Sequence, residues 1–234
     1  MDPRLQPVSS TPYAQGAELA LQQHRVLRNT YFLLALTLIP TVIGAAIGTN
    51  IDLSIMRAHP IISLFAVLAI FYGWIYAIER NRETGIGVAL LLGFTLFLGL
   101  LLGPLLQRVL GFSNGVQLVM MAAGGTAAVF FTLASVASTT KRDFTKLGSF
   151  LMIGAIVIML AVIANAFMQS PVLHLVLLCG FIILSSVMIL FHVNSIVHGG
   201  ETNYVSATLS LYIAIYNLFS ALLQILGITS SSSD

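Results

Sequence analysis

Charge is scarce in this sequence of 234 residues, since Lys, Arg, Asp and Glu together make up 8% of it. A typical soluble domain carries about 25% of these residues, whereas 58% of this chain is hydrophobic. Such a composition excludes a disordered chain, a nucleic-acid-binding module and a water-soluble enzyme. The net charge of +2 is too small to indicate an acidic partner.

Catalytic and metal-binding patterns are scarce too. Cys179 is the single cysteine, so it has no partner for an intrachain disulfide and does not complete a zinc site alone. The sequence has no HExxH motif and no pair of aspartates within an apolar run, which are parts that intramembrane proteases need. The sequence also shows no recognisable nucleophile–base pair, which an enzyme that acts on lipid would need. We therefore predict a protein that is not an enzyme and has no metal or cofactor.

Long apolar runs are what the sequence has instead. A helix that crosses the hydrocarbon core needs about 20 mostly apolar residues. In lipid, only a helix or a closed barrel satisfies the backbone, and the alternation of a barrel strand is absent. We predict an all-α integral membrane protein, a bundle of seven transmembrane helices. The seven runs are 31–48, 61–78, 85–105, 116–139, 147–168, 172–191 and 204–226.

Polar segments flank the predicted membrane domain, which covers residues 30–227. Residues 1–29 contain Pro3, Pro7 and Pro12, and we expect them to form a flexible cytoplasmic tail with a short amphipathic piece around residues 17–26. They lack the apolar core and cleavage site of a signal peptide. Residues 228–234 are expected to form a short polar tail at the other end.

Basic residues fall unevenly on the two sides of the predicted spans, eight on one side and two on the other. Loops rich in Lys and Arg stay in the cytoplasm. With seven spans, the N-terminus is then cytoplasmic and the C-terminus outside. The eight are Arg4, Arg25, Arg28, Arg80, Arg82, Lys141, Arg142 and Lys146, and the two are Arg57 and Arg108.

Charged residues are absent from the middle of the spans. A charge at mid-membrane costs at least about 2.5–3.5 kcal/mol, so a chain that keeps one there usually uses it. Without a lysine inside a helix, a retinal pigment is excluded. Without a buried carboxylate, an ion-coupled carrier is disfavoured.

The last span carries a stripe of small and polar residues along one face. At 100° per residue these side chains fall within an arc of roughly 80°. Such a face does not suit lipid, so we expect the helix to be enclosed by the others, with Asn217 pointing inward. The stripe either packs against neighbouring helices or lines a water-filled cavity. It consists of Asn203, Ser206, Ser210, Ala214, Asn217, Ala221 and Gln224.

Two histidines, His192 and His198, bracket the inner end of the sixth span beside Glu201. A histidine near a carboxylate titrates near neutral pH, so these three residues are candidates for pH sensing. The alternative is that they are ordinary residues of the membrane interface. Their spacing is too loose to predict a metal site.

Glycines predict close helix packing, because small residues admit a neighbouring backbone. Pro104 is expected to end or kink the third span. The small-residue steps are Gly44 with Gly48, Gly99 with Gly103, and Gly124 with Gly125.

Three stretches together form a family pattern. They are GLLLGPL at 99–105, TTKRDF at 139–144, and HGGETNY at 198–204 followed by NLF at 217–219. Over about residues 24–227 the sequence resembles the Bax inhibitor family and is similar to its bacterial YccA-like subgroup. The resemblance implies seven helices with the last one enclosed, and a role as modulator of the FtsH protease in the bacterial inner membrane.

Many members of this family are held to be pH-sensitive calcium leaks gated by two aspartates. The corresponding positions here hold His192 and Ala214. Because calcium binds oxygen ligands, the missing carboxylate pair argues against such a leak.

Two functions are therefore weighed. The first is a non-enzymatic membrane protein that modulates an FtsH-type, ATP-dependent protease, with the N-terminal tail as a handle. The alternative is a pH-sensitive calcium or proton leak or a transporter. Its pH-sensing or pore-lining candidates are His192, His198, Glu201, Asn203, Ser210, Ala214 and Asn217. The expected partners are the lipid bilayer and a membrane protease complex, with no nucleic acid.

Overall fold

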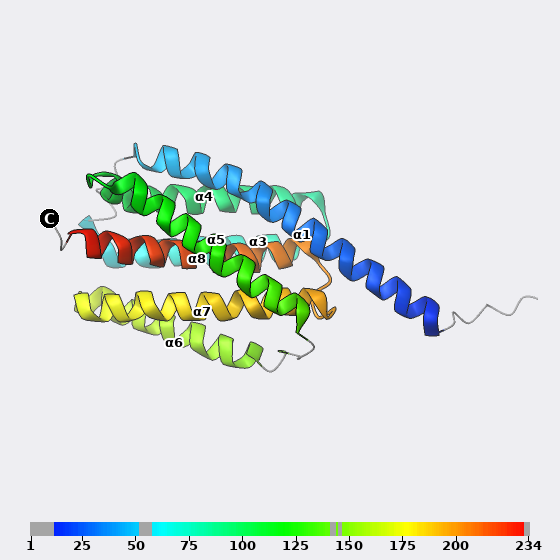
Figure 1. Cartoon of the computed structure of the whole chain (residues 1–234). Helices are drawn as coiled ribbons and strands as arrows, with labels where there is room; N and C mark the ends of the chain where they lie inside the picture. The colour runs from blue at the N-terminus through cyan, green and yellow to red at the C-terminus, as the bar shows by residue number, and fades with distance from the viewer. Residues whose placement is uncertain (1–11, 52–57, 141–143, 145–146, 232–234) are drawn as a thin grey trace, which may run out of the picture.

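The computed structural model describes residues 12–51, 58–140, 144 and 147–231, of which residues 12–20 and 231 are described by their backbone alone. Within these ranges the chain forms seven helices that run back and forth along one direction (Figure 1). Each is long and apolar enough to cross a membrane, so the predicted fold class is confirmed. The helices are α1 (Pro12–Gly48), α3 (Pro60–Arg80), α4 (Gly85–Leu110), α5 (Gly115–Thr139), α6 (Leu147–Met168), α7 (Pro171–Val197) and α8 (Tyr204–Ser231).

The two ends of the chain are more helical than predicted. α1 begins at Pro12, so residues 12–29, which we assigned to a tail, are the first turns of the first membrane helix. Likewise α8 continues to Ser231. Apolar runs mark where a helix meets lipid, whereas residues such as Ala, Leu, Gln and Glu continue a helix into water. Residues 1–11 and 232–234 lie outside the described part of the chain.

The helix α4 continues through Pro104 to Leu110, so of the two expected effects of Pro104, an end or a kink, the end is wrong. A proline inside a helix removes one backbone donor and disturbs one turn. Membrane helices tolerate this because neighbouring groups satisfy the freed backbone.

The helix α8 lies at the centre of the bundle. It packs against α1, α3, α4, α5 and α7, and the side chains of Leu211, Ala214 and Leu218 are fully buried. Two of its tyrosines also hydrogen-bond to neighbours: the hydroxyls of Tyr212 and Thr41 lie 2.7 Å apart, and the Tyr216 hydroxyl donates to a carbonyl of α4 at 3.1 Å. The prediction that the last span is enclosed is confirmed.

Two helices lie at the periphery, α3 and α6. The helix α6 has one buried side chain, that of Leu151, and it packs against α7 and more lightly against α3. The turn between α6 and α7 consists of Gln169 and Ser170, so the two helices are antiparallel neighbours, as the sequence predicted. Within the described ranges, α6 does not pack against α4 or α8.

Glycines bring α1 and α4 into backbone contact. A Cβ atom on Gly99 would overlap the Thr41 carbonyl oxygen, and one on Gly103 would overlap the backbone of Gly48. The predicted packing role of these glycines is confirmed. It is wrong for Gly124, around which a Cβ atom would meet nothing within 4 Å.

Candidate functional site

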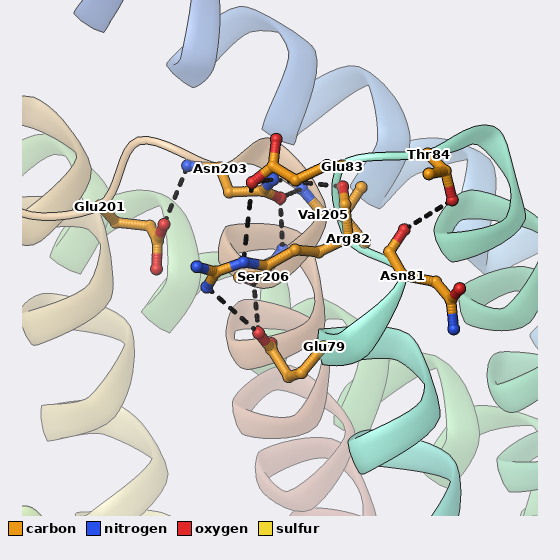
Figure 2. Close-up of polar contacts among 9 residues, drawn as sticks. All are labelled: Glu79, Asn81, Arg82, Glu83, Thr84, Glu201, Asn203, Val205 and Ser206. Atoms are coloured by element: carbon orange, nitrogen blue, oxygen red, sulfur yellow. Dashed lines mark hydrogen bonds and ion pairs between the residues drawn. The ribbon is translucent and has the colours of Figure 1, made fainter.

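Polar side chains gather where α8 begins, against the turn that joins α3 to α4 (Figure 2). We call this group the end cluster. It consists of Glu79, Arg82, Glu83, Glu201, Asn203 and Ser206.

Asn203 is the centre of the end cluster. Its side-chain oxygen accepts hydrogen bonds from the backbone N–H groups of Val205 at 2.8 Å and Ser206 at 3.2 Å, which caps α8. Its amide nitrogen donates to the Arg82 carbonyl oxygen at 3.1 Å and to the Glu83 carboxylate at 3.0 Å. One buried amide therefore starts α8 and holds the α3–α4 turn against it.

Three carboxylates surround this helix end. The Ser206 hydroxyl donates to Glu79 at 2.8 Å, and the Asn203 backbone N–H donates to Glu201 at 2.9 Å. Negative charge is stabilised at a helix N-terminus, where unpaired N–H groups point outward. The ion pairs of Arg82 with Glu79 at 3.4 Å and Glu83 at 3.7 Å are partly exposed, so each contributes at most about 1 kcal/mol.

The hydrogen bonds of the end cluster join the start of α8 to the α3–α4 turn. Its carboxylates accept hydrogen bonds from fixed donors. Among the described residues, no group of three or more His, Cys, Asp or Glu side chains is placed to hold a metal ion.

The end of α7 is held by a second set of contacts. Gly199 has φ +77°, and its N–H and that of Gly200 bond back to the carbonyls of Ile196 and Ser195. A left-handed residue of this kind closes a helix, and glycine adopts that conformation most readily. The Nδ1 atom of His198 lies 2.9 Å from the Asn194 carbonyl oxygen, so this exposed histidine completes the helix end.

The predicted site residues do not form one site. Glu201 and Asn203 belong to the end cluster, while His192 lies against the Phe191 ring. Within the described chain, no hydrogen bond or ion pair joins His192, His198 and Glu201 to one another. Ser210 and Ala214 lie in the packed middle of α8, with Ala214 fully buried.

Asn217 lies in a different place, on the wall of a cavity of about 500 Å³ between α4, α6, α7 and α8. The cavity is in the half of the bundle away from the end cluster. Besides Asn217, its polar lining consists chiefly of Arg108, Asn165, His174, Ser220 and Gln224.

Sequence reasoning missed most of this cavity lining. His174 and Asn165 are not among the residues that the sequence patterns singled out. These side chains come from four helices, so no local pattern joins them. One signal was available: Arg108 is one of only two basic residues assigned to its side of the membrane.

One sequence pattern is explained by its place in the fold. Residues 111–115 read GFSNG and match G-x-S-x-G, in which a strained strand-to-helix turn presents a nucleophilic serine. Here the pattern lies in the turn between α4 and α5, where Ser113 is exposed. A helix-to-helix turn does not provide that geometry.

Known proteins resemble this chain over nearly its whole length. The model of the family described as "Inhibitor of apoptosis-promoting Bax1" matches residues 23–231. The "Modulator of FtsH protease YccA" of Escherichia coli K12 is 43% identical over 210 residues, which are 90% of this chain and 93% of that protein. The "Inner membrane protein YccA" of Escherichia coli O6:H1 matches equally well. An "Uncharacterized membrane protein" of Vibrio cholerae is 36% identical over 92% of this chain and 94% of its own length.

Proposed function

This chain belongs to the Bax inhibitor family, and we propose that it modulates a membrane-bound, ATP-dependent protease of the FtsH type without catalysing a reaction itself. The observation that carries the proposal is the 43% identity, over 90% of the chain, to a protein named a modulator of that protease. The same similarity supports a place in the bacterial inner membrane.

The first turns of α1 supply a handle for such a protease. In Figure 1, α1 extends well beyond the other helices at the end where α7 meets α8. Leu21 is exposed on this extension, whereas Val26 is already part of the core. A protease that extracts membrane proteins must first engage a segment outside the lipid, and residues 12–21 are such a segment.

The packing of α1 supports a role as an occupant that resists extraction. Force on the extension would be transmitted along α1 to its contact with α4, where Gly99 faces the Thr41 backbone and Gly103 faces Gly48. The bond between Tyr212 and Thr41 adds a connection to α8. Pulling α1 out therefore separates several tightly packed helices at once.

Charge supports an orientation with this extension in the cytoplasm. Arg25 and Arg28 follow Gln23 on α1, and Gln23 lies against Gly199 in the α7–α8 connection. The α3–α4 turn, with Arg80 and Arg82 beside it, is bonded to Asn203 at the start of α8. These arginines therefore share one end of the bundle, and basic residues favour the cytoplasmic side. Arg4, Lys141, Arg142, Lys146 and Arg57, which also entered the prediction, lie outside the described residues. The C-terminus would then lie outside the cell.

The handle is tested by deleting residues 2–20. This deletion retains Gln23, which lies against Gly199, and the core residue Val26, so the bundle should keep its thermal stability. We expect the full chain to co-purify with FtsH from native membranes and to slow turnover of a second membrane substrate. The deletion variant should lose both effects.

Removal of residues 231–234 is the matched control, because this end lies on the opposite side of the bundle. It should leave association and turnover unchanged. If the deletion of residues 2–20 is equally silent, the handle is wrong. If the full chain neither associates with FtsH nor alters turnover, the proposed function itself is wrong.

The alternative, a pH-sensitive ion leak or transporter, has less support from the geometry. The cavity is lined on α8 by residues from Tyr216 to Gln224, and His192, His198, Glu201, Asn203, Ser210 and Ala214 do not line it. A calcium or proton flux into liposomes that Asn217→Leu abolishes would favour this alternative over the protease role.

A further inference from the structure

The cavity between α4, α6, α7 and α8 has a polar mouth and an apolar interior. Arg108 near the end of α4, Asn165 near the end of α6, His174 near the start of α7 and Gln224 near the end of α8 all lie toward one end of the bundle. Deeper along the same helices the wall consists largely of Leu, Val, Phe and Tyr side chains. The lining from residue 216 to 224 of α8 covers about 12 Å along the axis.

Among the described residues, the charged side chain at the mouth is that of Arg108. The described acidic side chains are Glu79, Glu83 and Glu201, and all three lie at the opposite end of the bundle. Arg108 is exposed and has no acidic partner within the described part of the chain. A guanidinium group in this state favours a phosphate or carboxylate, which it binds with two parallel hydrogen bonds.

The cavity lies within the membrane-spanning part of the bundle. α4 and α6 both line it, yet within the described ranges they do not pack against each other. α3 packs against both of them, and all three helices are membrane spans, so the apolar interior of the cavity lies at the depth of the acyl chains. A volume of about 500 Å³ is in the range of roughly 300–1,000 Å³ that is typical of ligand pockets.

We propose that this cavity binds an anionic lipid, with the acidic headgroup on Arg108 and one acyl chain running inward between α4 and α7 toward Tyr216. His174 and Gln224 are placed to donate further hydrogen bonds to the headgroup at the mouth. The Asn217 amide lies on the wall farther in. This site is independent of the protease role, because it lies at the other end of the bundle from the α1 extension.

The test uses the full chain in phosphatidylcholine nanodiscs that contain increasing amounts of phosphatidylglycerol. Native mass spectrometry after mild release counts the lipids that stay bound. We expect one retained phosphatidylglycerol per chain, and an apparent affinity about tenfold lower for Arg108→Gln, because the variant loses a charge-assisted contact. Arg82→Gln removes the same charge at the opposite end and should have no effect.

Two further measurements distinguish the contribution of the acyl chain from that of the headgroup. Val162→Trp, on the peripheral helix α6, fills the interior while leaving Arg108 in place, and should reduce retention as strongly as Arg108→Gln. If palmitate binds and Arg108→Gln weakens that binding, the site is supported and its ligand is identified as a fatty acid. The proposal is overturned by equal retention of phosphatidylcholine, by inorganic phosphate binding as tightly as phosphatidylglycerol, or by equal losses in Arg82→Gln and Arg108→Gln.

Discussion

The helices α6 and α8 are both membrane spans, but they occupy opposite environments. α6 has the highest mean hydropathy of the seven, and 6% of its most apolar 18-residue stretch is buried inside the protein. α8 shares the lowest mean hydropathy with α5, and 39% of the corresponding stretch of α8 is buried. The more apolar helix is the one that faces lipid.

This difference shows which forces assemble the bundle. Lipid tails are as apolar as leucine, so burying an apolar side chain gains little from hydrophobicity alone. Close packing and hydrogen bonds decide which helix is inside. Accordingly α8 has the tyrosine contacts and the Asn203 cap, whereas α6 exposes apolar side chains such as Phe150 and Leu160.

The largest expected effect comes from the same truncation made in both helices. Leu218→Ala in α8 removes a fully buried side chain and should lower the free energy of unfolding by about 2–5 kcal/mol, because it leaves a cavity. Leu160→Ala in α6 removes a side chain that is 60% exposed and should change the free energy of unfolding by less than about 0.5 kcal/mol. Thermal unfolding in detergent measures both. Equal losses would show that α6 is as tightly packed as α8.

A smaller effect is expected at the contact between α1 and α4. Gly99→Ala places a methyl group against the Thr41 carbonyl and should destabilise the protein by about 1–3 kcal/mol. Gly124→Ala is the matched control, since its methyl group meets nothing within 4 Å. The control should be neutral or slightly stabilising, because alanine favours a helix by roughly 0.5–1 kcal/mol. A harmless Gly99→Ala would contradict the backbone contact.

The smallest effect is expected at the end cluster. Asn203→Ala removes the cap of α8 and the two bonds to the α3–α4 turn, and should cost about 1–2 kcal/mol. Asn203→Asp keeps the capping oxygen but places a carboxylate beside Glu83. We expect it to be less stable than wild type at neutral pH, because two carboxylates then repel each other, and to recover part of this loss in acidic buffer. Stability of Asn203→Asp that does not change with pH would contradict this arrangement.

The spans and the central position of α8 were predictable from the sequence. Apolar length identifies a helix in lipid, and the polar stripe from Asn203 to Gln224 indicates a helix without a lipid-facing side. The extension of α1 was not predictable in the same way, because residues 12–29 have helix-forming side chains but no apolar run.

Contacts between distant segments were beyond the reach of sequence patterns. Ser206 and Glu79 are 127 residues apart in the chain. The sequence around either residue does not indicate that the Ser206 hydroxyl will bond to the Glu79 carboxylate. The cavity is a similar case, because Arg108, Asn165 and His174 come from three helices. Their meeting depends on how α6 is displaced from α4, which no periodicity encodes.

The two-residue connection between α6 and α7 determines how the cavity can open. Gln169 and Ser170 join these helices at the mouth, and the Asn165 side chain accepts a hydrogen bond from the Ser170 backbone at 3.1 Å. This hinge fixes the separation of α6 and α7 at that level, while no turn connects α6 to α4. The helix α6 also contacts α3, where the Tyr72 hydroxyl lies 3.7 Å from the Met159 sulfur, so the cavity widens only if α6 moves away from α3 and α4 together while its end stays tied to α7.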